Sequence, residues 1–237
     1  MRLKKKDLRT RLPLPIPADS KFYKMQSGFS FLVDGIKTCD KTSPKYLQYK
    51  KDAAYLYKRI QRAQKFVESI AEMKMETRRA NQRSLIKMLG YLGLVESMGA
   101  AMVDFAIVIL LVNDYCFHIE SMIGVPRIRH AISIEDFAEE QVSLGTRLAF
   151  LRQNKLDFLA KMIDKKLRNC VAHLDFKIEE DGRIYWKKRN RYAELDIDQK
   201  IAEFRETIAS FELFLTESGM LSFMEKQAET EANTSAH

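Results

Sequence analysis

The segment LRNCVAH, residues 167–173, brings together an arginine, an asparagine and a histidine within six positions. A histidine side chain titrates near neutral pH and can accept or donate a proton. An arginine guanidinium binds phosphate oxygens and stabilises negative charge on them, and an asparagine adds neutral hydrogen bonds. Arg168, Asn169 and His173 are therefore candidates for chemistry at a phosphate group.

This combination suits the cleavage of RNA, because the 2′-hydroxyl group of RNA is itself a nucleophile. Such a reaction needs a base, an acid and a group that stabilises charge, and it needs no metal ion. One helix supplies one histidine. Two copies of the chain related by a two-fold axis would supply an acid and a base, together with two arginines.

A purely structural interpretation of the same residues stands beside this one. Asn169 and His173 share a helix face, whereas Arg168 lies about 140° from His173 around an ideal helix. Arginine and histidine are common in the last turn of a helix, where they bind free carbonyl groups. Asp164 and Arg168 are also spaced for an ion pair within one helix.

The elements around the segment are predicted to be mainly helical. Apolar residues recur at helical spacing in 134–152, 155–172 and 197–217. Residues 174–187 instead alternate apolar and polar side chains around Asp181 and Gly182, a pair typical of hairpin turns. The pattern predicts helices joined to one small β-hairpin.

Residues 85–117 form the most apolar stretch of the chain, interrupted by Glu96 and Asp104. A carboxylate at bilayer depth is costly, so we expect a buried helix and no membrane segment. On a regular helix both acids lie in one stripe with the small residues Gly99 and Ala100. Buried acids need partners, and an arginine on another helix would supply one.

The front of the chain is basic. Ser43 and Pro44 are a good helix start, and the helix is expected to run to about Arg83. Residues 1–21 are expected to form an extended basic arm, and 22–43 are mixed enough for short helices or turns.

The charges are unevenly distributed. Residues 37–83 hold 13 Lys and Arg against 5 Asp and Glu, whereas residues 192–237 hold 3 against 10. This suits binding of a polyanion or head-to-tail pairing between subunits, although solvated helix faces give the same pattern. If RNA is bound, the candidate contacts are Lys58, Arg59, Arg62, Arg78, Arg79 and Arg83.

Cysteines and histidines argue against a metal or a disulfide framework. Cys39, Cys116 and Cys170 are far apart and odd in number, and His118 and His130 have no partner at ligand spacing. We therefore expect no metal and no cofactor. The charged N-terminus shows no secretory signal, which makes the cytoplasm the expected location.

Two stretches resemble a known family. LRNCVAH is similar to the Arg-x4-6-His signature of HEPN domains, in the form where Asn follows Arg. YLGLVESMGAAMVDFAIVILL resembles the apolar, acid-bearing helix that precedes the motif helix in these domains, and AHLDFKIEEDG resembles the continuation. The resemblance covers about residues 85–216.

The resemblance implies a helical bundle that acts as a dimeric, metal-independent endoribonuclease, as in toxins and antiviral defence systems. Arg168 would hold the scissile phosphate, His173 would be the acid or base, and Asn169 would support both. Glu96 or Asp104 would orient Arg168 from the earlier helix.

The chain departs from the family in two respects. Toxins that are silenced by a partner nucleotidyltransferase carry a tyrosine two residues after the histidine, where this chain has Asp175. That mode of control is not expected here, although another inhibitory or activating protein is compatible with the sequence. Residues 1–84 resemble no family that we can name.

We therefore expect an all-α protein. Its predicted parts are a basic arm and helical module (1–84), a HEPN-like bundle with a hairpin near 174–187 (85–217) and an acidic flexible tail (218–237). The expected function is RNA cleavage by a homodimer. The alternative is a non-catalytic helical adaptor that binds RNA or a protein partner.

Overall fold

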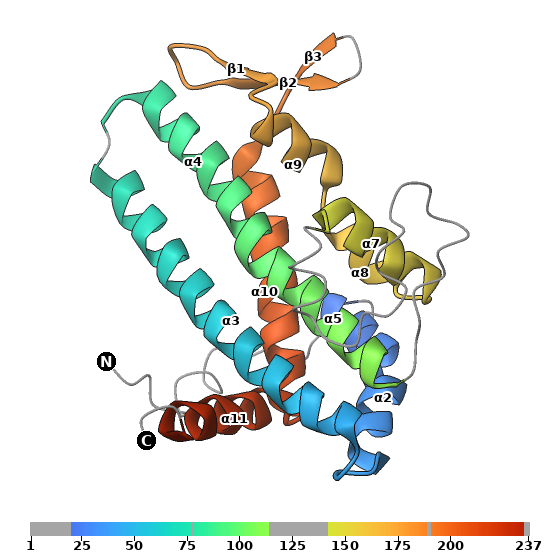
Figure 1. Cartoon of the computed structure of the whole chain (residues 1–237). Coiled ribbons are helices and arrows are strands. Elements are labelled where there is room, and N and C mark those ends of the chain that lie inside the picture. Colours follow the sequence, from blue (N-terminus) through green and yellow to red (C-terminus); the bar gives the residue numbers. More distant parts are fainter. Residues whose placement is uncertain (1–19, 77, 114–141, 189–190, 235–237) are drawn as a thin grey trace.

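The protein is described by a computed structural model that covers residues 20–76, 78–113, 142–188 and 191–234. It is mostly helical with one small sheet at one end, as expected (Figure 1). The helices are α2 (Lys21–Thr38), α3 (Pro44–Glu76), α4 (Ala80–Leu94), α5 (Ala100–Val112), α7 (Leu144–Gln153), α8 (Asp157–Met162), α9 (Lys165–Ala172), α10 (Ile197–Glu217) and α11 (Met220–Thr234). The predicted arm lies almost wholly outside the described residues.

One continuous helix runs through the centre of the molecule, made of α4, a π-helical turn (Val95–Gly99) and α5. In that turn the Ala100 N–H donates to the Val95 carbonyl, a longer step than the four residues of an α-helix. Residues 100–110 of α5 are all buried. By length and composition alone Ala80–Val112 could cross a membrane, but 78% of its most apolar window is buried inside the protein.

Helix α3 packs along the central helix and begins as the sequence predicts. The Tyr46 N–H donates to the Ser43 Oγ atom at 3.2 Å, so Ser43 caps the helix and Pro44 is its first residue. The helix ends at Glu76 rather than near Arg83. Arg79 precedes the first turn of α4, so the chain changes helix before the predicted domain boundary at residue 84.

The segment expected to be short helices or turns is one regular helix, α2. The Ser20 hydroxyl accepts from the Tyr23 N–H at its start. Met25, Phe29 and Leu32 are fully buried. The missing side chain of Gly28 leaves room for the Phe158 ring, so a residue that weakens an isolated helix is used here for close packing.

The predicted flexible tail differs most from the structure, because residues 220–234 form helix α11 packed on α3. Met220, Met224 and Ala228 recur every four residues and are buried. The Phe223 ring stacks on Tyr49 with centroids 5.2 Å apart. The acidic composition concealed this apolar stripe, which is stable only when α3 covers it.

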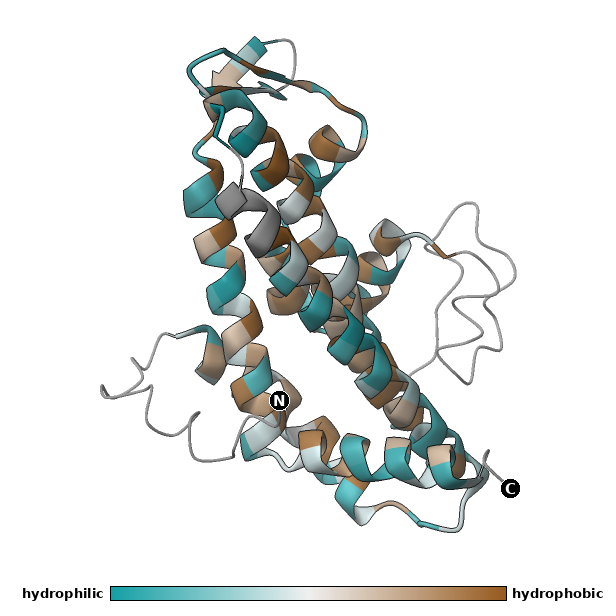
Figure 2. Cartoon of the chain, turned by 90° about the vertical axis from the view of Figure 1, so that its left-hand side faces the viewer, coloured by the Kyte–Doolittle hydropathy of each residue, from teal (hydrophilic) through white to brown (hydrophobic). Residues whose placement is uncertain are grey.

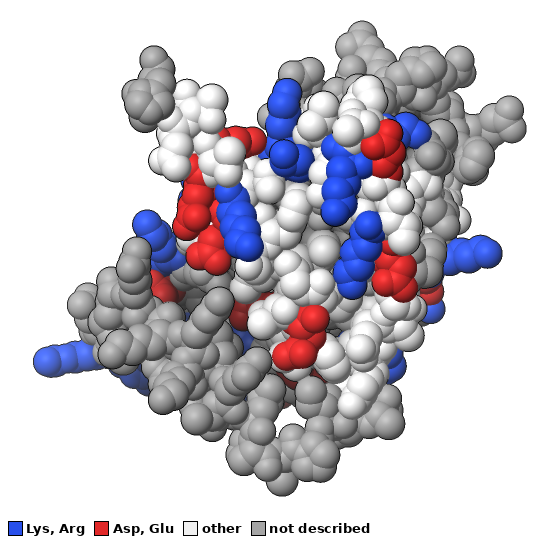
Figure 3. All heavy atoms as spheres, turned by 90° about the horizontal axis from the view of Figure 1, so that it is seen from below, with Lys and Arg blue, Asp and Glu red and all other residues white. Residues whose placement is uncertain are grey.

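Packing of α11 on α3 also places acidic residues next to basic ones within one chain. Lys58 pairs with Glu231 at 3.6 Å. Seen from the side of α11, Lys and Arg side chains alternate with Asp and Glu side chains (Figure 3). Some of the basic charge at the front of the sequence is therefore paired with acidic charge from the C-terminal part of the same chain.

The predicted division into a front module and a bundle is not visible in the packing. One hydrophobic core includes Phe29 of α2, Leu56 of α3, Ile107 of α5 and Phe211 of α10. The side of α3 that faces outward shows many hydrophilic residues (Figure 2). The front helices are thus walls of the same bundle, because their apolar stripes have no other partner.

The region predicted as one helix, 155–172, is two helices. Ile163 is extended, and the Asp164 Oδ1 atom accepts from the Leu167 N–H at 3.0 Å, which starts α9 afresh. The apolar stripe of the prediction is nevertheless buried throughout: Leu156, Leu159, Ile163, Leu167 and Val171. Within the predicted helix 134–152, residues 134–141 lie outside the described residues and α7 occupies the remainder.

The predicted hairpin is present and is extended by a third strand. Strands β1 (Phe176–Ile178), β2 (Ile184–Lys188) and β3 (Arg191–Glu194) form an antiparallel sheet in that order. Gly182 has φ of +90° at the first turn, where glycine is favoured. Helix α10 then covers the predicted span, residues 197–217, and is capped by Asp196.

Candidate active site

Helix α9 presents the RNCVAH residues at the end of the bundle nearest the sheet (Figure 1). Leu167, Cys170 and Val171 are buried against the core and fix the rotation of the helix. Arg168 and Asn169 are therefore half-buried at its edge, and His173 at its end is exposed. The amphipathic pattern alone thus determines that these polar side chains lie at the surface.

The end of α9 is capped by its own backbone. The N–H groups of His173, Leu174 and Asp175 donate to the carbonyls of Asn169, Val171 and Cys170 at 2.9, 3.2 and 2.9 Å. Leu174 has φ of +57°, so the last two bonds form a Schellman motif with a leucine where glycine is usual. The interpretation of Arg168 and His173 as side-chain caps is therefore not needed.

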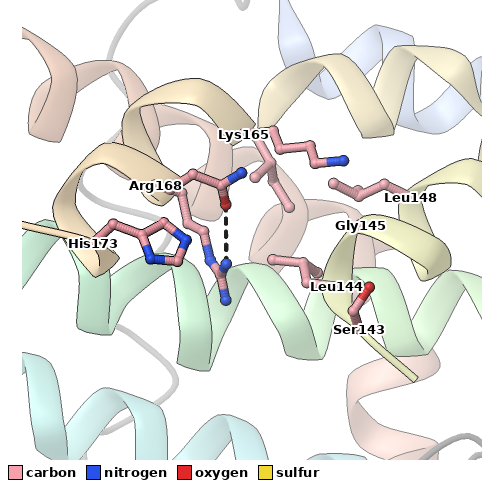
Figure 4. Close-up of a pocket in the computed structure, with 9 residues that line it drawn as sticks. Ser143, Leu144, Gly145, Leu148, Lys165, Arg168 and His173 are labelled. Atoms are coloured by element: carbon pink, nitrogen blue, oxygen red, sulfur yellow. Dashed lines mark hydrogen bonds between the residues drawn. The ribbon is translucent and has the colours of Figure 1, made fainter. Parts of the chain in front are cut away.

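The proposed ion pair between Asp164 and Arg168 is not what the structure contains. Asp164 caps the start of α9, whereas the Arg168 Nε atom donates to the Glu96 carboxylate. The Arg168 Nη1 atom donates to the Asn169 Oδ1 atom at 3.0 Å. Arg168 is held from two sides, which turns the guanidinium towards His173 (Figure 4).

The choice that the sequence left open between two acids is decided by their positions. Glu96 lies in the π-helical turn and points out to Arg168. Asp104 is completely buried and pairs instead with Arg147 of α7, at 2.6 Å, and with Arg59 of α3. The two acids differ in their surroundings, because Asp104 is covered where arginines of α3 and α7 reach it, whereas the Glu96 side chain is 39% exposed beside Arg168.

A pocket of about 310 Å³ opens between α9 and the start of α7. Figure 4 shows the Arg168 and His173 side chains on one side of it and residues 143–145 on the other. Its lining consists of Ser143, Leu144, Gly145, Leu148, Ile163, Lys165, Arg168, Asn169 and His173. The residues singled out in the sequence thus line a single concave site.

Lys165 is a site residue that the sequence did not single out. It is the first residue of α9, and a Cβ atom placed on Gly145 would lie 3.0 Å from its Nζ atom. Among the described residues, no carboxylate pairs with this ammonium group. Its spacing of three residues from Arg168, one helical turn, is the signal that could have identified it.

The site has the properties of a general acid–base centre with cationic charge. His173 can exchange protons with water or a bound group because its imidazole is exposed, and Arg168 and Lys165 can bind phosphate oxygens. Within the described part of the chain, no three His, Cys, Asp or Glu side chains are grouped to hold a metal ion. His118 and His130 lie outside that part.

Cys170 is next to the site without being suited to react. Its Sγ atom donates to the Asp175 carbonyl at 3.0 Å, and burial raises the pKa of its thiol. A raised pKa lowers the fraction of thiolate, which is the nucleophilic form. The polar side chains of α9 remain the better candidates.

The predicted RNA contacts do not form one surface with equal access. Arg59 is held by buried Asp104 and Lys58 by Glu231, so these two have structural partners. Arg62 is exposed on α3, while Arg78, Arg79 and Arg83 are exposed around the start of α4. The Arg83 Nη1 atom donates to the Arg78 carbonyl at 2.8 Å.

The chain matches no protein-family model, no curated protein and no solved structure.

Proposed function

We propose that this protein is a metal-independent endoribonuclease of the HEPN type. The observation that carries the proposal is the convergence of Arg168, Asn169 and His173 on one pocket, with Glu96 holding Arg168 from the neighbouring helix. Because backbone bonds already cap α9, the helix end does not account for these side chains. RNA is the substrate class because its 2′-hydroxyl supplies the nucleophile that the site lacks.

The proposed reaction is a transesterification. His173 removes the proton from the 2′-hydroxyl, whose oxygen attacks the adjacent phosphorus. Arg168 stabilises the added negative charge on the phosphate oxygens. The bond to the 5′-oxygen breaks, and that oxygen takes a proton from a second acid. The products are a 2′,3′-cyclic phosphate and a free 5′-hydroxyl.

A homodimer provides the second acid, because each copy has one histidine at this site. His173 is exposed, and the next residue, Leu174, is a leucine with 68% of its surface accessible. An apolar side chain beside a catalytic group suits contact with a second copy. Mixing wild type with an excess of His173→Ala protein tests this, because a site that needs both histidines is inactive in mixed dimers and activity should fall below the wild-type fraction.

The cellular role that fits such an enzyme is that of a toxin or an antiviral defence nuclease in the cytoplasm, restrained or triggered by another protein. The competing function is a non-catalytic helical adaptor for RNA or protein. It is favoured by one observation: the Arg168 guanidinium is already partly neutralised by Glu96. As an adaptor, the protein would need Arg168 and His173 for stability.

The deciding experiment incubates wild type, His173→Ala and Lys166→Ala with labelled single-stranded RNA in EDTA. We expect cleavage by wild type and Lys166→Ala, with 2′,3′-cyclic phosphate ends, and a loss of about 100-fold or more for His173→Ala. His173 is exposed, so the His173→Ala variant should have the same melting temperature as wild type. If His173→Ala cleaves RNA as fast as wild type, the assignment is refuted. If none of the three proteins cleaves RNA and His173→Ala has a lower melting temperature than wild type, the adaptor is favoured.

A further inference from the structure

The outer face of the sheet carries a second set of residues suited to nucleic acid. The register pairs Lys177 with Tyr185 and Lys187 with Tyr192. Because side chains alternate along a strand, these four lie on the same face. The opposite face holds Phe176, Ile184 and Trp186 and packs towards the core.

Aromatic and cationic groups are accessible on this face. The Tyr192 side chain is 46% exposed, and the Lys177 Nζ atom lies 4.4 Å from its ring centroid. Lys177 and Lys187 are exposed, and neither of them pairs with a carboxylate within the described residues. An exposed ring with cations beside it can stack on a base while the cations bind the adjoining phosphates.

Charge divides the sheet into two ends. The turn from β1 to β2 carries Glu179, Glu180 and Asp181, and Glu194 lies near it opposite Tyr185. The other end, where β2 leads to β3, carries Lys187 opposite Tyr192. A polyanion is therefore attracted to the β2–β3 end alone.

This basic end is joined directly to the candidate active site. The Lys187 N–H donates to the Asp175 carbonyl at 2.9 Å, and Asp175 is two residues beyond His173. The Asp175 N–H in turn belongs to the cap of α9. Figure 1 shows the sheet next to the end of α9. A strand bound on the sheet thus has a short route to the pocket.

We propose that the β2–β3 end of the sheet is a binding surface for single-stranded RNA. Tyr192 stacks on a base, and Lys177 and Lys187 contact phosphates. The choice of RNA rests on the proposed function, whereas the stacking role of Tyr192 is tested separately. This surface, rather than Lys58 and Arg59 of α3, binds the part of the substrate that lies outside the pocket.

The test measures binding of a labelled single-stranded RNA about 12 nucleotides long to His173→Ala protein, in which the RNA stays intact. Adding Tyr192→Ala should weaken binding about 10-fold, whereas Tyr192→Phe should keep it. Lys177→Ala and Lys187→Ala should each lower the slope of log affinity against log salt by about 0.7. Tyr23→Ala and Lys51→Ala are the matched controls, because Tyr23 on α2 and Lys51 on α3 are exposed residues. The melting temperatures of all variants are compared to verify folding.

Each outcome separates the two proposals. The proposed RNA-binding surface would be overturned by any of three results. These are unchanged binding after Tyr192→Ala, no RNA binding by the His173→Ala protein itself, and equal competition by duplex RNA. Cleavage by wild type alongside any of these leaves the proposed catalysis standing. Binding that depends on Tyr192 without cleavage by wild type would support the surface and count against the nuclease.

Discussion

Glu96 and Arg168 are 72 positions apart in the sequence, and their side chains form an ion pair, of which Arg168 also lines the pocket. The Nε atom of Arg168 donates to Glu96, and its Nη1 atom donates to Asn169. The planar guanidinium is thus fixed at two edges, and its orientation no longer depends on the flexible side-chain stem. Glu96 is in this sense a positioning residue for Arg168.

Replacing Glu96 with glutamine should slow RNA cleavage about 10- to 100-fold, because a misplaced guanidinium stabilises the transition state poorly. Arg168→Lys should also lose activity, because an ammonium group cannot bind Glu96 and Asn169 in the same plane. Single-turnover rates with saturating RNA measure the effect, and Glu217→Gln on α10 is the control. A Glu96→Gln enzyme with wild-type kcat would show that the pair has no positioning role.

Lys165 should contribute to substrate binding rather than to proton transfer. Its ammonium lines the pocket one turn before Arg168, so Lys165→Ala removes one charge-assisted contact to phosphate. We expect KM for RNA to rise about 10-fold, with a smaller change in kcat. Lys166→Ala removes the same charge from the next position, which does not line the pocket, and should leave KM unchanged. Equal effects of the two substitutions would indicate only a general loss of positive charge.

Asp104 should matter for stability. Its buried carboxylate joins Arg59 and Arg147, whose side chains are 24% and 14% exposed. Asp104→Ala leaves these arginines without their partner and should lower the free energy of unfolding by about 3–5 kcal/mol. Urea denaturation measures the change. The pair of Lys87 and Asp198 provides the control: the Asp198 side chain is 61% exposed, so Asp198→Ala should cost less than about 1 kcal/mol.

A further outcome would revise the assignment of Asp104. If Asp104→Ala abolished RNA cleavage at a temperature where the variant is fully folded, Asp104 would have to act on the site through Arg147 and α7. The structure instead predicts that activity of the folded fraction stays near that of wild type.

Glu212 predicts a measurable dependence of stability on pH. Burial raises the pKa of its carboxyl group above the ordinary value, although a hydrogen bond from Gln64 opposes the shift. The folded state therefore holds this proton more tightly than the unfolded state. The associated stability is fully present below the unfolded pKa and is lost as pH rises through the folded pKa.

Glu212→Gln should therefore stabilise the protein slightly at pH 7 and have little effect below about pH 4. Thermal melts across this pH range measure the difference, with exposed Glu206→Gln as the control. A difference that is constant with pH would mean that the carboxyl group is not perturbed in the folded protein.

The local pattern of the sequence determined much of the fold. The alternation around Asp181 and Gly182 predicted the hairpin, and the apolar spacing of 197–217 predicted α10 to the residue. Ser43 and Pro44 predicted the start of α3. These features depend on neighbouring residues, so they can be read without knowing what lies across the core.

Tertiary structure decided what depends on distant partners. Helix α11 exists because α3 covers its apolar stripe, which is too weak to stand out in an acidic segment. Lys165 becomes a site residue only because Gly145 of another helix faces it.

The assignment of the two acids shows the same limit at the site itself. The sequence offered Glu96 and Asp104 as equals because a regular helix rotates by a constant angle per residue. Packing around the central helix differs at the two positions: Glu96 stays partly exposed and pairs with Arg168, whereas Asp104 is covered and pairs with Arg59 and Arg147. The residue types and their spacing were therefore enough to propose the chemistry, and only packing between helices could settle which acid serves the arginine.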